Sequence, residues 1–260
     1  MTNNTVRKAL LERKVTLGGW IQCGNAATAE IFAHAGFDWV AADAEHSDFD
    51  VASCTQLFRG LHGRGCTPLV RVRENDTLAI RQMLDAGAAG VIIPLIASPQ
   101  EAQRAVAASK YPPQGVRGYG FARMNEWGAN FDLYAASANE NVAIVVMIES
   151  KQGVENIDAI LAVDGVDGVF IGPYDLSGSY GIPGQTDAPA VVEACKHVVA
   201  ACASTGKSAG LHVVKPTPEN VTKAIADGFT FIALGLDSVF LQQGARSALA
   251  AARAAIEDAT

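Results

Sequence analysis

Polar residues that could do chemistry follow several short apolar runs of this chain. Asp43 and His46 come after DWVAA, Arg71 follows TPLV, Glu149 follows VAIVVMI and Asp175 follows GVFIGPY. In a barrel of parallel strands, side chains at the C-terminal ends of the strands converge on one mouth. Two carboxylates, a guanidinium and an Asp/His pair at one mouth would form an active site.

Glu149 and Asp175 are the candidate metal ligands. They are expected to end the fifth and sixth strands, and two carboxylates on adjacent strands can hold one hard divalent cation. Mg2+ favours such an arrangement, because it keeps coordination positions for water and an oxygen-rich substrate. From the pattern alone two structural roles stay open: Asp175 could cap a helix, and Glu149 could form an ion pair.

Arg71 lies within an apolar strand, where a guanidinium is costly to bury unless it meets a carboxylate or an anionic substrate. Asp43 or Glu45 could be its partner in a purely structural ion pair. The functional alternative is a fork that binds a substrate carboxylate or stabilises an oxyanion.

Asp43 and His46 are the candidate acid–base pair. A carboxylate that accepts a hydrogen bond from an imidazole fixes its tautomer and raises its basicity, which suits proton transfer near neutral pH. Trp20 and His212 are expected to end strands one and seven and to line the mouth. For Trp20, simple packing inside the barrel is an equal alternative.

None of the expected strands contains a lysine that could form a Schiff base inside the barrel. Lys151 and Lys215 come just after strands five and seven, where the start of a helix accounts for them. This favours a metal ion over an imine as the electron sink.

Eight apolar runs, rich in Val, Ile and Ala, alternate with stretches of helical periodicity, which predicts a (β/α)8 barrel. An open doubly wound sheet is the alternative, but no GxGxxG follows the first strand. The expected strands are 16–22, 38–43, 67–72, 90–94, 142–149, 166–171, 208–213 and 229–234. The expected helices are 26–35, 50–61, 76–86, 98–109, 151–162, 188–204, 217–226 and 237–256, with a short one near 131–139.

Composition narrows the function classes. The 260 residues carry a net charge of −7 with no basic block, which argues against nucleic acid and anionic membranes as partners. No linker divides residues 1–260, so a single domain is expected. The five cysteines contain no CxxC pair and the N-terminal segment has no apolar signal core, which together predict a reduced, cytoplasmic protein.

At these residues the chain resembles the class II, metal-dependent pyruvate aldolases of the 4-hydroxy-2-oxoheptanedioate and 2-dehydro-3-deoxyglucarate aldolase type. The resemblance spans nearly the whole chain in family order. The matching stretches are AGFDWVAADAEH, PLVRV, MLDAGAAGVIIP, YPPQGVRG, IES, VDGVFIGPYDLS and the weaker GFTFIALGLD.

The resemblance implies a (β/α)8 barrel in a homo-oligomer, typically a hexamer, that cleaves a 4-hydroxy-2-oxo acid into pyruvate and an aldehyde through a metal-stabilised enolate. It implies Mg2+, Mn2+ or Co2+ on Glu149 and Asp175. Pyruvate would be contacted by Arg71 at its keto oxygen, and at its carboxylate by the backbone near Gly172, Tyr174 and Asp175. His46, oriented by Asp43, would be the acid–base group.

Three positions depart from these relatives, because Met147, Tyr174 and His212 stand where Gln, Ala and an apolar residue are usual. They leave the acceptor aldehyde open, and Arg123 in the 119–128 loop is a candidate contact for the distal end of the substrate. Two other functions stay open: an enzyme that decarboxylates oxaloacetate or transfers the enolate to another acceptor, and a barrel that only binds an oxo acid.

Overall fold

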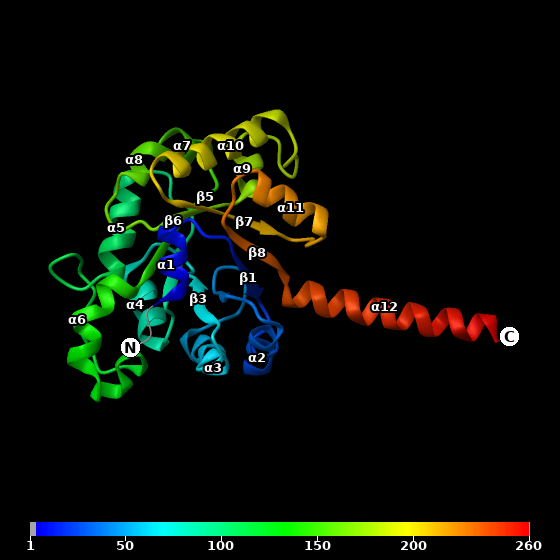
Figure 1. Cartoon of the computed structure of the whole chain (residues 1–260), viewed down its shortest axis with the longest axis horizontal. Helices are drawn as coiled ribbons and strands as arrows, with labels where there is room; N and C mark the ends of the chain where they lie inside the picture. Colours follow the sequence, from blue (N-terminus) through cyan, green and yellow to red (C-terminus); the bar gives the residue numbers. More distant parts are fainter. Residues whose placement is uncertain (1–3, 260) are drawn as a thin grey trace.

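The computed structural model describes residues 4–259 and shows a closed barrel of eight parallel strands (Figure 1). The strands pair in chain order, and β8 closes onto β1. The predicted (β/α)8 fold is therefore confirmed. The strands are β1 (Thr16–Ile21), β2 (Trp39–Asp43), β3 (Thr67–Arg71), β4 (Gly90–Ile93), β5 (Ala143–Ile148), β6 (Gly168–Ile171), β7 (Ser208–Val213) and β8 (Phe231–Leu236).

Helices connect the strands and cover the barrel. Most begin at a side-chain cap; Asp76 Oδ1, for example, accepts the backbone N–H groups of Leu78 and Ala79. The helices are α1 (Thr5–Leu11), α2 (Ala26–Ala35), α3 (Val51–Leu61), α4 (Thr77–Ala86), α5 (Pro99–Ser109), η1 (Arg123–Gly128), α6 (Phe131–Asn141), α7 (Lys151–Glu155), α8 (Ile157–Leu161), α9 (Pro173–Ser179), α10 (Pro189–Ser204), α11 (Pro218–Ala226) and α12 (Asp237–Asp258).

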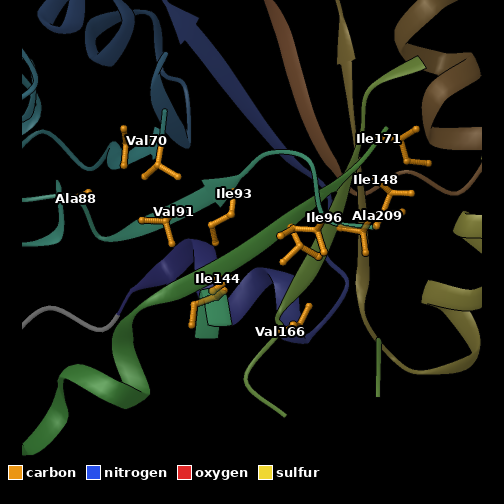
Figure 2. Packing of buried hydrophobic residues seen from close by; sticks show 14 of the residues in the cluster. Val70, Ala88, Val91, Ile93, Ile96, Ile144, Ile148, Val166, Ile171 and Ala209 are labelled. Atoms are coloured by element: carbon orange, nitrogen blue, oxygen red, sulfur yellow. The ribbon is translucent and has the colours of Figure 1, made fainter. Parts of the chain in front are cut away.

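Strand side chains divide between two apolar layers because they alternate in direction. The inner cluster fills the barrel with residues such as Trp39, Leu69 and Phe231. The outer cluster lies between strands and helices, and Figure 2 shows part of it, including Val91 and Ile144. Strands covered on both faces are nearly continuously apolar, which is why the sequence pattern revealed them.

The structure differs from the expected elements at several points, and β6 also begins two residues later than expected. β8 lies two residues later than expected, the helix expected over 151–162 is divided at Asn156, and α1, η1 and α9 were not expected. Asn156 has a non-helical backbone, and its Nδ2 donates to the carbonyl of Ala97 at 2.8 Å, which accounts for the break.

α1 closes the end of the barrel opposite the mouth. Val6 and Leu10 join the inner apolar cluster. Arg7 forms an ion pair with the buried Asp167 at 3.0 Å, and Ser208 donates to the Leu10 carbonyl at 2.8 Å. In the part of the chain that the structure describes, α1 therefore closes the lower end of the barrel and leaves the mouth as the open end.

α12 runs away from the barrel (Figure 1). Asp237 at its start is buried and accepts the N–H groups of Gln22 and Cys23 at 2.9 and 2.8 Å. From Leu241 onward every described residue of α12 is exposed. Within residues 4–259, no helix combines the length and the apolar character needed to cross a membrane.

Candidate active site

Arg71 and Asp43 form the centre of the mouth. They end neighbouring strands β3 and β2, whose register places Asp43 directly beside Arg71. The guanidinium donates from Nε to Asp43 Oδ1 at 2.9 Å and from Nη2 to Oδ2 at 2.7 Å. Burial raises the pKa of Asp43, but the hydrogen bonds and charge of Arg71 outweigh it and hold that pKa below its ordinary value.

Asp43 does not bind the His46 imidazole, which corrects the expected pair. Its Oδ1 accepts the backbone N–H of His46 at 3.2 Å, and both of its oxygens are engaged by Arg71. The imidazole is 61% exposed, and its Nε2 lies 3.8 Å from Glu45 Oε2. Asp43 therefore fixes the turn that carries His46, and Glu45 is the carboxylate that faces the ring.

Glu45 links the acid–base group to the guanidinium. Its Oε2 lies 3.0 Å from Arg71 Nη1, on the edge of the fork that Asp43 does not occupy. Burial raises the pKa of Glu45 in spite of the nearby charges of Arg71 and His46, and Asp43 and Asp175 add to the rise. Arg71 is thus held from two sides by carboxylates.

Glu149 follows β5 and is buried at the mouth. Its Oε1 accepts the backbone N–H of Leu95 at 2.6 Å, from the loop after β4. Burial raises the pKa of Glu149, and the negative charges of Glu45 and Asp175 raise it further. A Cβ at Gly172 would lie 3.0 Å from Glu149 Oε2, so glycine at that position lets β6 approach the carboxylate closely.

Asp175 and Tyr174 lie in the first turn of α9, directly after β6, and both side chains are exposed. Backbone N–H groups in the first turn of a helix have no partner within it and can receive an anion. The charge of Asp175 raises the pKa of both Glu45 and Glu149, although the three residues come from three different strand ends. The structure therefore brings together the carboxylates that the sequence placed at the mouth.

Trp20 and His212 form the floor of the mouth together with Arg71. The Arg71 guanidinium carbon lies 5.2 Å from the centre of the Trp20 ring, and the His212 ring stacks on Trp20 at 5.3 Å. His212 Nε2 donates to the Gly235 carbonyl at 2.9 Å, and burial lowers the pKa of His212. The lowered pKa favours the neutral ring, and because the carbonyl can only accept, Nε2 carries the proton in that form and Nδ1 is left as an acceptor.

The carboxylates fit a hard divalent cation. Within residues 4–259, no three His, Cys, Asp or Glu side chains form a closed metal cage. Among the described residues, none donates a hydrogen bond to Glu149 Oε2, and a positive ion would relieve the repulsion among Glu45, Glu149 and Asp175. Two protein carboxylates with open positions are the donor set that Mg2+ favours.

Two contacts of the site were not found from the sequence. Gln22 Nε2 donates to Asp43 Oδ2 at 2.8 Å, and Gln22 follows strand one by a single residue, so the pattern used for the other mouth residues could have found it. The Leu95 N–H donor carried no sequence signal.

Arg123 does not lie at the mouth: its Nη1 donates at 3.2 Å to the carbonyl of Ala86, at the end of α4 opposite the mouth.

Comparisons with known proteins find relatives over most of the chain. The family model described as HpcH/HpaI aldolase/citrate lyase matches residues 16–243. A 5-keto-4-deoxy-D-glucarate aldolase of Salmonella paratyphi C (strain RKS4594) is 38% identical over 235 residues, which cover 90% of this chain and 91% of the relative.

Solved structures also share the fold. A HpcH/HpaI aldolase/citrate lyase family protein from Burkholderia cenocepacia J2315 has a TM-score of 0.91 and 31% identity, covering 96% of this chain and 99% of that chain. Macrophomate synthase has a TM-score of 0.86 and 26% identity, covering 99% and 91%. The match extends over almost the whole chain, so it includes the barrel and all strands that carry the mouth residues.

Proposed function

The chain belongs to the HpcH/HpaI aldolase/citrate lyase family and is a carbon–carbon lyase, an aldolase, and from this premise we propose that it reversibly cleaves a 4-hydroxy-2-oxo acid into pyruvate and an aldehyde. The relatives named for 5-keto-4-deoxy-D-glucarate support a sugar-derived keto acid as the substrate class. The observation that carries the proposal is the Arg71–Glu45 ion pair at the mouth, together with Glu149, on which the charges of Glu45, Asp175 and Arg71 all act.

Glu149 and Asp175 would hold Mg2+, Mn2+ or Co2+, which would polarise the 2-oxo group and offset the negative charge that develops there. Asp43 and Glu45 fix the orientation of Arg71 from two sides, and each of its two terminal nitrogens keeps one N–H that could reach the 2-oxo oxygen. A donor held in place before the reaction stabilises a developing oxyanion without reorganisation. The role of Arg71 is thus to stabilise the oxygen of the pyruvyl half.

His46 is the group that moves the proton. It accepts the proton of the substrate 4-hydroxyl while the C3–C4 bond breaks, and the electron pair of that bond stays on the pyruvyl half as the enolate. The aldehyde then leaves, and a proton returns to C3 to give pyruvate. Glu45, 3.8 Å from the imidazole, stabilises the protonated ring during this step.

Four further residues would contact the substrate. Backbone groups from Gly172 to Asp175 would bind the pyruvate carboxylate, and Trp20 and His212 would form the wall behind it. Tyr174 is 67% exposed at the rim, where it could contact the aldehyde part. These residues are substrate contacts in the proposal, and the chemistry rests on His46, Arg71 and Asp43.

The test is pyruvate release from 5-keto-4-deoxy-D-glucarate, followed with lactate dehydrogenase. We expect turnover in Mg2+, Mn2+ or Co2+, none after chelation, and recovery when metal is restored. A Glu149→Gln variant serves as the control for metal held elsewhere. Full turnover in EDTA, or unchanged turnover in Glu149→Gln, would contradict the proposal.

A second reaction on the same site is favoured by His212 and by one relative. Macrophomate synthase shares the barrel, and its name denotes synthesis instead of cleavage. Decarboxylation of oxaloacetate, or transfer of the enolate to another acceptor, would use the same mouth residues. Negligible oxaloacetate turnover beside fast cleavage of hydroxy-oxo acids would exclude the decarboxylase alternative.

We also propose that the enzyme is a homo-oligomer, with a hexamer as the size implied by the resemblance. In a (β/α)8 barrel the helix after each strand covers the outside of the barrel. α12 instead leaves Leu241 and Leu249 exposed, and the outward-facing Leu17 and Leu234 of β1 and β8 are only partly buried. A second copy's α12 would cover this uncovered face, because helices in proteins depend on packing for stability.

Light scattering after gel filtration tests the assembly. Leu241→Glu and Leu249→Glu together should reduce the mass toward that of one chain. Gln243→Glu, on the opposite side of α12, is the matched control and should leave it unchanged. A full-length chain that is monomeric at all concentrations would overturn the proposal.

We further propose that the chain works as one domain in the cytoplasm. α1 plugs the barrel and α12 continues directly from β8, which supports one unit over residues 1–260. All five cysteines are free, as expected in a reducing compartment. Oxo acid and aldehyde are then its small-molecule partners, with neither nucleic acid nor membrane required.

A further inference from the structure

A crevice on the outer helix layer has a charge balance opposite to that of the mouth. It has a volume of about 310 Å³ and is lined by residues of α3, α4 and η1. We propose that this crevice binds a small organic anion, with a carboxylate or phosphate group held by Arg59 and Arg123 and a flat apolar part resting on Trp127. The inference does not depend on the proposed reaction.

The two arginines of the crevice have no acidic partner. Within residues 4–259, neither Arg59 nor Arg123 forms an ion pair. Asp85 also lines the crevice, but it is paired with the buried Arg117 at 2.7 Å. Arg123 is half-buried and Arg59 is exposed beside it. A half-buried charge in a protein is normally paired, so the Arg123 guanidinium next to a second guanidinium and without a carboxylate marks a place where an anion would be stabilised.

Arg123 is held in place by neutral groups only. Its Nη1 donates to the Ala86 carbonyl at 3.2 Å, and its Nη2 lies 3.5 Å from the Phe58 carbonyl. Burial and the charge of Arg59 lower the pKa of Arg123. A Cβ at Gly87 would lie 1.9 Å from Arg123 Nη1, so the guanidinium occupies space that only glycine leaves open.

Trp127 is fixed as the third wall by an unusual loop. It is 66% exposed, and both it and Glu126 have left-handed backbones, with φ of 53° and 54°. Asn125 is buried and holds this turn, accepting the N–H groups of Ala122 and Gly128 at 3.0 Å. Such strain persists only where the surroundings enforce it, and it is common at ligand clamps.

These features select the ligand chemistry. Guanidinium forks bind carboxylate and phosphate oxygens with two parallel hydrogen bonds, and an exposed indole offers a flat apolar surface. The volume lies at the lower end of the range for ligand sites, so the anion is small. Thr55 and Gln82 add polar side chains to the lining.

Intrinsic fluorescence provides the test, because Trp127 is exposed whereas Trp20 and Trp39 are buried. Benzoate titrated into the full chain should change the emission saturably, and the change should disappear in Trp127→Phe. Arg59→Gln should weaken binding about tenfold or more. Arg104→Gln replaces an exposed arginine of α5 outside the crevice and is the matched control, with no expected change.

Other probes separate the sources of the signal. Neutral benzamide should bind far more weakly than benzoate, and tighter binding of phenyl phosphate would support the site and assign it to phosphate. Arg123→Lys provides a second variant that keeps the charge but loses the fork, and it should also weaken binding. Two results with the wild-type chain would overturn the proposal: benzamide binding as tightly as benzoate, or no binding of benzoate, phenyl phosphate or inorganic phosphate. Two results with variants would also overturn it: a fluorescence change that persists in Trp127→Phe, or wild-type affinity in both arginine variants.

Discussion

The barrel mouth and the crevice between α3, α4 and η1 both contain arginine, but with opposite charge balance. At the mouth, Arg71 is held by Asp43 and Glu45, and Glu149 and Asp175 add two further carboxylates. In the crevice, Arg59 and Arg123 face no free carboxylate, since Asp85 is already paired. The presence of an arginine therefore does not by itself indicate which ligand binds. The net charge of the region, once its ion pairs are counted, does.

The difference implies opposite ligands. Excess negative charge at the mouth fits a divalent cation and an oxo acid that binds with it. Excess positive charge in the crevice fits an anion. The experiments that follow alter one region at a time, so that each sharpens or breaks this contrast.

Replacing Glu149 by Gln should have the largest effect, a loss of turnover on the order of a thousandfold or more, because it removes a carboxylate that would hold the cation. Pyruvate release at saturating Mn2+ measures the loss. Circular dichroism checks that the barrel is intact. Turnover within tenfold of wild type would remove Glu149 from the site.

Arg71→Lys should reduce kcat by a few hundredfold, because lysine keeps the charge but cannot hold Asp43 and Glu45 through a fixed fork. The same change at the exposed Arg104 is the control. A variant with raised KM and normal kcat would show that Arg71 binds substrate without stabilising the enolate oxygen.

His46→Gln should reduce kcat about a hundredfold and remove the limb of the pH–rate profile that depends on the imidazole. Steady-state rates across pH measure both effects. His62, which ends α3 and lies away from the mouth, provides the matched histidine control. A profile that keeps its shape in the His46 variant would assign proton transfer to another group.

Gly87→Ala tests the crevice, where a Cβ would collide with Arg123 and the backbone φ of 128° is unfavourable for alanine. We expect about 2 kcal/mol of destabilisation, measured by urea unfolding. Anion binding should fall and aldolase kcat should stay as in wild type. Gly36→Ala, with left-handed φ and open space around its Cβ, separates the collision from the backbone strain.

The smallest effect concerns acid stability. Because the pKa of Asp43 lies below its ordinary 3.8 in the folded protein, the unfolded chain takes up this proton first as pH falls. The Asp43–Arg71 pair therefore stabilises the folded protein fully at pH values above the unfolded pKa of Asp43. This stabilisation is lost as the pH falls through the lower pKa that Asp43 has in the folded protein. Asp43→Asn should show a shallower loss of unfolding free energy below pH 4. An unchanged slope would show that the pair does not contribute.

Much of the barrel could be predicted from the sequence because strands buried on both faces are continuously apolar and the helix caps are local. The expected helix 26–35 agrees with α2, and Gly36 has the left-handed backbone expected at its end. α1 was missed because its seven residues are stabilised by distant contacts, such as Arg7 with Asp167. The division at Asn156 likewise depends on a carbonyl from another element, Ala97.

The sequence predicted which residues lie at the mouth, but it predicted less well which of them form hydrogen bonds or ion pairs with one another. The position after a strand indicated Glu149, Asp175 and Arg71, because parallel strands end at one edge. Which carboxylate faces the His46 imidazole depends on the path of the turn after β2, and the sequence carries no periodic signal for that path. The outward direction of α12 also could not be predicted, since its residues have ordinary helical character.

Deuterium exchange at the pyruvate methyl group, followed by NMR, tests the account of the mouth most directly. Chelated enzyme should show no exchange, and added Mg2+, Mn2+ or Co2+ should start it, with Glu149→Gln inactive under all conditions. That result would demonstrate formation of the pyruvate enolate at a mouth that needs a divalent cation. Exchange that persists in the chelated enzyme, or its absence with every metal, would contradict the account.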